Sequence, residues 1–372
     1  MSSHRRPLDD EEPADEQSNS DPEAADLPAG LSPRSYSFWI GALLLHGSVT
    51  PRVIGDVLGF GLLAMLTVIA CSIIEALFGA NLQFAVSPFS PAGAVLGLLL
   101  VLRINAGYDR WWEARKLWGG IVNQSRNLGI IALSYGPADK AWRVRLIRWL
   151  AAYPHIVRRS LRGERTLPEI ERLLGKGEAA NIASAQHMPD FVSREIAALL
   201  RMAQASGMND WSFYEAERQR GLLIDYLGGC ERILRTPLAR ATVITVRRFI
   251  FLFLATLPFA LLHQLDSSVT AFTIAGVEFR ASLWLIPLFI MLLAYPLLAL
   301  DRIGMELQNP FDRARLDHLP LDRICVTIET NLIELLNLDS APGERPLAPQ
   351  PVVPPPDATI TESLHPFNTD VS

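Results

Sequence analysis

Four apolar segments that approach the thickness of a lipid bilayer constrain this 372-residue chain more than any other feature. They lie near residues 55–78, 88–104, 241–263 and 282–300. A helix needs about 20 apolar residues to cross the hydrocarbon core. The second segment turns polar at Arg103, so its apolar part is short for a helix that faces lipid. We therefore expect other helices to shield it from lipid. The sequence therefore predicts four membrane-spanning helices, the second of them sheltered.

The chain also carries too much charge to lie wholly within a membrane. Apolar residues make up 49% of it and charged residues 20%, which fits a body that is part membrane and part aqueous. Between residues 103 and 240 there are 22 Lys and Arg against 14 Asp and Glu, an excess of +8. The loops before the second and fourth spans together hold one basic residue, Arg280. Because basic residues gather in cytoplasmic loops, we expect both termini and the regions 105–240 and 301–340 to be cytoplasmic.

Apolar residues recur at helical spacing through 105–240, which predicts an almost entirely helical cytosolic region. Breaks between its helices are predicted where glycine or proline interrupts the pattern. These are Gly136-Pro137, Gly163, Gly175 and Gly177, Gly207, and Gly228-Gly229. The acidic segment 1–33 and the proline-rich segment 341–372 lack apolar periodicity, so we expect disordered tails on either side of a 34–340 body.

The sequence contains no familiar pattern for catalysis, cofactor binding or metal binding. Its three cysteines are far apart, and no two histidines have the spacing of a zinc site on a helix. Phosphate-binding glycine loops and the GxSxG nucleophile pattern are also missing. We therefore expect neither an enzyme nor a resident cofactor or metal, and no nucleic-acid partner.

Ala94, Leu98 and Leu102 are spaced four residues apart and form one stripe along the second span. Around a symmetry axis, such stripes form an apolar ring that gates ions by expelling water. The alternative is that apolar residues repeat there only because the helix is packed in a membrane. Periodicity alone favours this alternative, whereas the shortness of the segment favours the pore.

Charged and aromatic residues at the membrane boundary also have more than one interpretation. Arg247 and Arg248 are either permeation charges or interfacial residues that reach the cytoplasmic surface, and the second is preferred. An aromatic belt accounts for Tyr108, Trp111, Trp112 and Trp118. Ion pairs within or between subunits, or a solvated helix face, account for Arg110, Glu113, Arg115 and Lys116.

Two stretches, INAGYDRWWEARKLWGGIVNQSRNLG after the second span and LQNPFDRARLDHLPLDRIC after the fourth, resemble the bestrophin family of ion channels in its bacterial branch. The motif residues that carry this resemblance are Asn105, Tyr108, Asp109, Arg110, Trp111, Trp112, Glu113, Arg115 and Trp118, with Asn309, Pro310 and Phe311. It covers the chain from about Ser35 to Leu336 and leaves out both tails.

The resemblance implies a homopentamer of helical subunits around one central pore in a bacterial inner membrane. The second span then supplies a hydrophobic neck at Ala94, Leu98 and Leu102, where Ala94 is smaller than the family's Ile or Phe. A second, cytosolic constriction falls near Tyr214. Animal members bind Ca²⁺ through an acidic run after NPF. Here Asp312 and Asp317 form at most a weak remnant of that run, because two arginines lie between them, and Ca²⁺ prefers several oxygen ligands.

The resulting prediction is an all-α, four-span channel that passes small monovalent ions passively, above all chloride and other anions. Two other functions stay open. One is a Na⁺-conducting channel on the same fold, and the other is a non-conducting membrane scaffold whose tails recruit partners.

Overall fold

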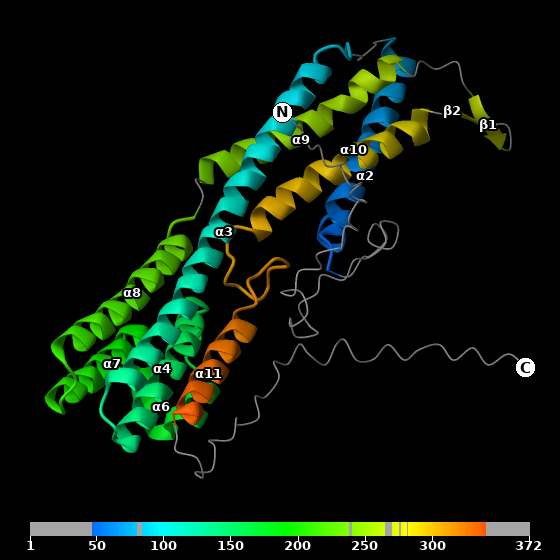
Figure 1. Ribbon diagram of the computed structural model, residues 1–372. Coiled ribbons are helices and arrows are strands. Elements are labelled where there is room, and N and C mark those ends of the chain that lie inside the picture. Colours follow the sequence, from blue (N-terminus) through cyan, green and yellow to red (C-terminus); the bar gives the residue numbers. More distant parts are fainter. Residues whose placement is uncertain are drawn as a thin grey trace, which may run out of the picture. The chain divides into compact units, whose positions relative to one another are not determined.

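The computed structural model describes residues 47–79, 84–237, 240–264, 270–274, 277–280 and 282–339 (Figure 1). The predicted tails, 1–33 and 341–372, lie outside these ranges. Four described helices are long and apolar enough to cross a membrane, as the sequence predicts. They are α2 (Thr50–Phe78), α3 (Phe89–Tyr135), α9 (Arg240–Gln264) and α10 (Ser282–Glu306).

The described residues form an all-α fold, as predicted, with one short two-stranded antiparallel hairpin added to it. Strands β1 (Thr270–Ile274) and β2 (Val277–Arg280) pair between α9 and α10, with Thr273 opposite Glu278. Their sequences, TAFTI and VEFR, are rich in the β-branched and aromatic residues that favour strands. The hairpin occupies the connection between the third and fourth spans and leaves the helical character of the rest unchanged.

Helix α3 is a single helix of 47 residues that begins among the spanning helices and continues beyond them into a second group of helices (Figure 1). At 1.5 Å per residue it is about 70 Å long. It ends at Gly136, the break predicted from Gly136-Pro137. A β-carbon at Gly136 would lie 2.3 Å from the carbonyl oxygen of Ala132 and 2.6 Å from the Trp142 ring, so only glycine fits this turn.

The spanning helices pack through small and branched apolar side chains. Leu96 and Leu100 of α3 are fully buried against α9 and α10, in a cluster with Val246, Ile250, Leu254 and Ala294. Helix α2 packs along α10. At Gly61 the two helices come so close that a β-carbon would lie 2.7 Å from the Met291 side chain.

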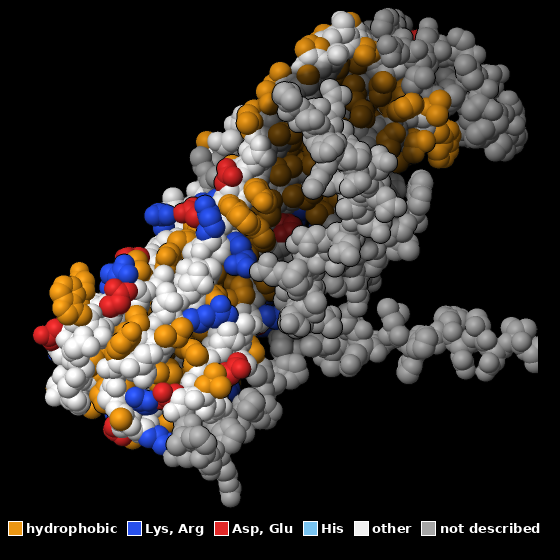
Figure 2. Space-filling view, viewed as in Figure 1, with side chains coloured by type: hydrophobic (Ala, Val, Ile, Leu, Met, Phe, Trp, Pro, Cys, Tyr) orange, Lys and Arg blue, Asp and Glu red, His pale blue; other side chains and the backbone are white. Residues whose placement is uncertain are grey.

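The remaining helices pack against the second half of α3, directly or through one another, and form the largest core. They are α4 (Lys140–Leu161), α5 (Pro168–Leu174), α6 (Lys176–Ser184), α7 (Met188–Ala205), α8 (Asp210–Arg235) and α11 (Leu321–Leu338). Their apolar faces bury one continuous cluster that includes Trp118, Tyr153 and Phe311. Figure 2 shows charged side chains over this half and apolar side chains over the spanning helices, as expected for a body that is part aqueous and part membrane.

Most predicted breaks between the cytosolic helices are confirmed, and one is wrong. Gly163, Gly175 and Gly207 lie at or just beyond helix ends, with positive φ angles of 71°, 93° and 106°. Gly228-Gly229 instead lies inside α8. A β-carbon at Gly229 would approach a methyl carbon of Leu117 in α3 to 2.7 Å, so this glycine permits close packing of two helices and ends neither.

Candidate ion pathway

Ala94, Leu98 and Leu102, which we call the α3 stripe, all lie exposed on the surface of the subunit. Leu98 is 60% exposed and Leu102 56% exposed, whereas Leu96 and Leu100 are fully buried. Successive residues turn by about 100° around a helix, so Leu98 points away from the side that Leu96 and Leu100 bury. The stripe therefore lies on an open apolar face, and its place in a neck stays a prediction.

Three charged residues from three spanning helices meet at the Leu102 end of the stripe, the end predicted to face the cytoplasm, and we call them the inner triad. Arg103 of α3 donates a hydrogen bond from Nη1 to Oδ1 of Asp301 in α10. Arg247 of α9 donates from Nε to Oδ2 of the same carboxylate at 3.0 Å. Arg103 and Asp301 are buried, whereas the side chain of Arg247 is half-exposed. Neither sequence interpretation of Arg247 included this contact.

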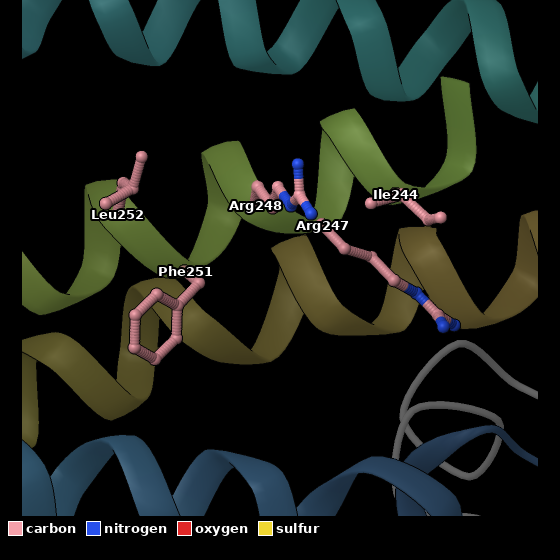
Figure 3. A pocket seen from close by; sticks show the side chains of 5 residues that line it. All are labelled: Ile244, Arg247, Arg248, Phe251 and Leu252. Atoms are coloured by element: carbon pink, nitrogen blue, oxygen red, sulfur yellow. The ribbon is translucent and has the colours of Figure 1, made fainter. Parts of the chain in front are cut away.

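Arg248, the next residue, leaves α9 in a different direction from Arg247 (Figure 3). Both side chains border an open groove of about 420 Å³ that Ile244, Phe251 and Leu252 also line. The groove is thus apolar with two basic residues, and its place on a spanning helix suits the boundary between lipid tails and headgroups.

The aromatic motif residues divide between the surface and the core. Tyr108, Trp111 and Trp112 stack, with ring centroids 6.2–6.5 Å apart, and Tyr108 and Trp112 are half-exposed. Trp111 donates from Nε1 to the carbonyl oxygen of Asp317 at 2.8 Å. Trp118 is fully buried among the helices that pack around the second half of α3. The interpretation of Trp118 as part of an aromatic belt is therefore wrong, because it lies on the face of α3 that this core covers.

The charged motif residues fasten α3 to neighbouring helices of the same subunit. Arg110 donates to backbone carbonyl oxygens at the end of α8, those of Ile233 and, at 2.7 Å, Thr236. Glu113 pairs with Arg232 of α8 at 2.6 Å. A carbonyl-rich helix end favours a cation, so Arg110 stabilises the contact of α3 with α8. Asn105, Asp109, Arg115 and Lys116 are exposed.

The NPF motif forms a buried turn, and a side chain at the end of α4 donates a hydrogen bond to it. Asn309 accepts a hydrogen bond from the amide of Phe311 at 3.3 Å, and the Phe311 side chain is fully buried. The carbonyl oxygen of Pro310 accepts from the amide of Leu319 at 2.8 Å. Arg162, at the end of α4, donates to the carbonyl oxygen of Phe311 at 3.1 Å. This second motif thus positions the segment between α10 and α11.

Arg162 belongs to a group of ion pairs that we call the arginine cluster. Its members are Arg158, Arg159 and Arg162 with Glu164, Glu169 and Asp322. Burial alone would raise the pKa of Glu169, but hydrogen bonds from Arg159 and Arg158 outweigh burial and lower that pKa to about 2. The pKa of Asp322 is lowered in the same way, with Arg162 as the main donor. The cluster ties α4 to α5 and to the start of α11.

The acidic residues after NPF have partners within the protein. Asp312 accepts a hydrogen bond from the amide of Ala314 at 2.9 Å, and the carbonyl of Asp317 accepts from Trp111. Glu306, nearby and fully buried, pairs with Arg52 at 2.7 Å and Arg302 at 2.9 Å. Among the described residues, no three His, Cys, Asp or Glu side chains gather as a metal site would require.

Tyr214 lies in the second turn of α8 with 67% of its surface exposed, near Trp211, which is 85% exposed. It is far along the chain from the α3 stripe, and its role as a lower constriction stays a prediction.

Sequence reasoning missed the pairing of Arg103 with Asp301. The sequence did hold one signal for this pair. Arg103 directly follows the second apolar segment and Asp301 directly follows the fourth, and the two residues have opposite charges.

A family model described as "Bacterial/Fungal Bestrophin protein" matches residues 31–334. A "Voltage-dependent anion channel-forming protein" of Nostoc sp. is 32% identical over 249 residues, which is 66% of this chain and 75% of the relative. A protein of the same description from Synechocystis sp. is 30% identical over 311 residues, covering 82% and 94% of the two chains. The crystal structure of a bacterial bestrophin homolog from Klebsiella pneumoniae matches with 26% identity and a TM-score of 0.66, covering 76% of this chain and 98% of that chain.

Proposed function

The chain belongs to the bacterial and fungal bestrophin family, and on this premise we propose that it is a membrane channel for small monovalent anions. Chloride is the first candidate, and the ions move passively down their electrochemical gradient. The printed names of the relatives, which describe anion channel-forming proteins, support this choice of ion. The excess of +8 between residues 103 and 240 supports it too, because basic surfaces raise the local concentration of anions.

One observation supports conduction through the subunit more than any other, namely the open apolar face of α3. Leu98 and Leu102 are more than half-exposed on a helix whose opposite side is buried. In a homopentamer around one central axis, five such faces form the hydrophobic neck. The neck is then wider at its outer level, where the small Ala94 lies, than at its inner levels, where Leu98 and Leu102 lie. An apolar ring of this kind stops ions when narrow and dry, and passes them when it widens and wets.

The proposal also assigns roles to the parts of the chain outside the neck. The 34–340 body is the channel, with both termini on the cytoplasmic side of a bacterial inner membrane. Tyr214, exposed on α8, forms the lower constriction. Ca²⁺ plays no part in opening, because Asp312 lies beside Arg315, and Glu306 is paired with Arg52 and Arg302.

Purified protein in planar bilayers under asymmetric NaCl tests the proposal through the reversal potential. We expect a value near the Cl⁻ equilibrium potential and no change on adding Ca²⁺ or a chelator. A value near the Na⁺ equilibrium potential would instead establish a cation channel on the same fold. A silent bilayer would favour the scaffold, in which deletion of 1–33 or 341–372 abolishes partner recruitment. The mass of the protein–detergent particle, measured by light scattering, tests the pentamer.

A further inference from the structure

The inner triad carries more positive charge than its single carboxylate can neutralise. Arg103 and Arg247 contribute two positive charges and Asp301 one negative charge, which leaves +1. Arg103 is only 5% exposed, and its Nε and Nη2 atoms have no hydrogen-bond partner among the described residues. A buried charge without full compensation is costly. Tight packing of the spanning helices therefore does not by itself account for the extra positive charge of the triad.

The surplus lies directly behind the α3 stripe. Arg103 follows Leu102 in the sequence but turns to the buried side of α3, where it lies against α10. A β-carbon at Gly304 would lie 3.4 Å from Cγ of Arg103 and 3.5 Å from its Nε. Apolar side chains of α3, α9 and α10 fill the space on the membrane side. The body of α3 itself lies between Arg103 and the stripe, so the field of the triad is screened less in that direction than in open water.

We propose that the positive surplus of the inner triad makes the inner end of the neck selective for anions, by its field and without touching the ion. The inference rests on the proposed conduction along the α3 stripe. The triad lies about 10 Å behind the stripe, one helix diameter. Across that distance, one unit charge at an effective dielectric constant of about 20 changes the anion-to-cation permeability ratio on the order of tenfold or more.

Arg247 is the residue at which the surplus can be changed with least damage. It is half-exposed, and its replacement leaves the buried pair of Arg103 and Asp301 in place. Arg247→Lys keeps the triad at +1, Arg247→Gln brings it to 0, and Arg247→Glu brings it to −1. We expect the Cl⁻/Na⁺ permeability ratio of the lysine variant to stay within about twofold of the wild type. The ratio should fall about tenfold for glutamine, and further for glutamate.

Arg248→Glu is the matched control, because it makes the same change of charge one residue away and outside the triad (Figure 3). We expect it to lower the permeability ratio by clearly less than Arg247→Glu does, which would separate the triad from a general effect of surface charge. The ratio comes from reversal potentials of the full chain in asymmetric NaCl, so a low yield of open channels does not alter it.

Two results would overturn the inference alone while the wild type conducts. One is a ratio that stays the same across the three Arg247 variants. The other is a shift in Arg248→Glu as large as that in Arg247→Glu. A wild-type protein that does not conduct would overturn the proposed function, and this inference with it.

Discussion

The two halves of α3 belong to one uninterrupted helix but meet their surroundings in opposite ways. In the half that follows Arg103, Trp118 and Ile121 are fully buried by helices of the same subunit. In the membrane half, Leu98 and Leu102 remain more than half-exposed. One half of α3 is thus fully packed within the subunit. The other half keeps an apolar face that the subunit itself does not cover. Substitutions in the two halves should therefore change different properties, stability in one and conduction in the other.

The largest loss of stability is expected for Trp118→Ala. Removing a fully buried tryptophan leaves a cavity in the largest core and costs about 3–5 kcal/mol of unfolding free energy. Denaturant unfolding of the detergent-solubilised protein measures the loss. Trp112→Ala, at a half-exposed position, is the control and should cost about 1 kcal/mol or less. Equal losses in the two variants would contradict the burial of Trp118 by the helices around it.

A smaller loss is expected where α3 and α8 approach closely. A β-carbon at Gly120 would lie 2.4 Å from the Tyr226 ring, whereas at Gly119 the nearest atom would be 3.7 Å away. Gly120→Ala should therefore overpack the contact and destabilise by about 1–3 kcal/mol. Gly119→Ala should be neutral or slightly stabilising, because alanine favours a helix over glycine. Thermal unfolding distinguishes them, and a loss in Gly119→Ala as large as that in Gly120→Ala would contradict the packing.

Acid should destabilise the largest core through the arginine cluster, which ties α4 to α5 and α11. The pKa of Glu169 is about 2 in the folded state, below the ordinary 4.5. A lowered pKa contributes stability that is present above about pH 4.5 and is lost as pH falls toward about 2. The melting temperature, followed by tryptophan fluorescence, should therefore drop across that window, and less steeply in Glu169→Gln. Glu171→Gln, at an exposed position two residues on, should keep the wild-type profile. An identical profile in Glu169→Gln would show that the cluster contributes no acid sensitivity.

The smallest change in stability, with the clearest change in conduction, is expected for Leu98→Ala. The side chain is 60% exposed, so its loss should cost the subunit no more than about 0.5–1 kcal/mol, while a wider neck raises the open fraction in bilayers. Leu96→Ala, fully buried two residues away, should lose about 2–5 kcal/mol. An unchanged current in Leu98→Ala would show that Leu98 does not face the pore.

Local patterns in the sequence predicted the spanning helices, the end of α3 at Gly136 and the helical cytosolic region. Each depends on residues close together in the chain, namely an apolar run, a glycine–proline pair and helical spacing. Contacts between distant residues were not predictable. Asp301 is 198 positions from Arg103 and 54 from Arg247, and no local pattern brings them together. Gly229 was interpreted as a break because its role depends on Leu117 of another helix. The role of the α3 stripe in a neck depends on neighbouring subunits, which one sequence does not describe.

The continuity of α3 has a mechanical consequence. Arg110 fixes the helix to the end of α8 through backbone carbonyl oxygens, and 21 residues, or about 32 Å, separate it from the outer end at Phe89. With Arg110 as fulcrum, a tilt of about 5° moves that outer end by about 3 Å, comparable to the size of a water molecule. The helix is thus a lever arm, in which a small tilt about its contact with α8 becomes a larger displacement at the membrane end.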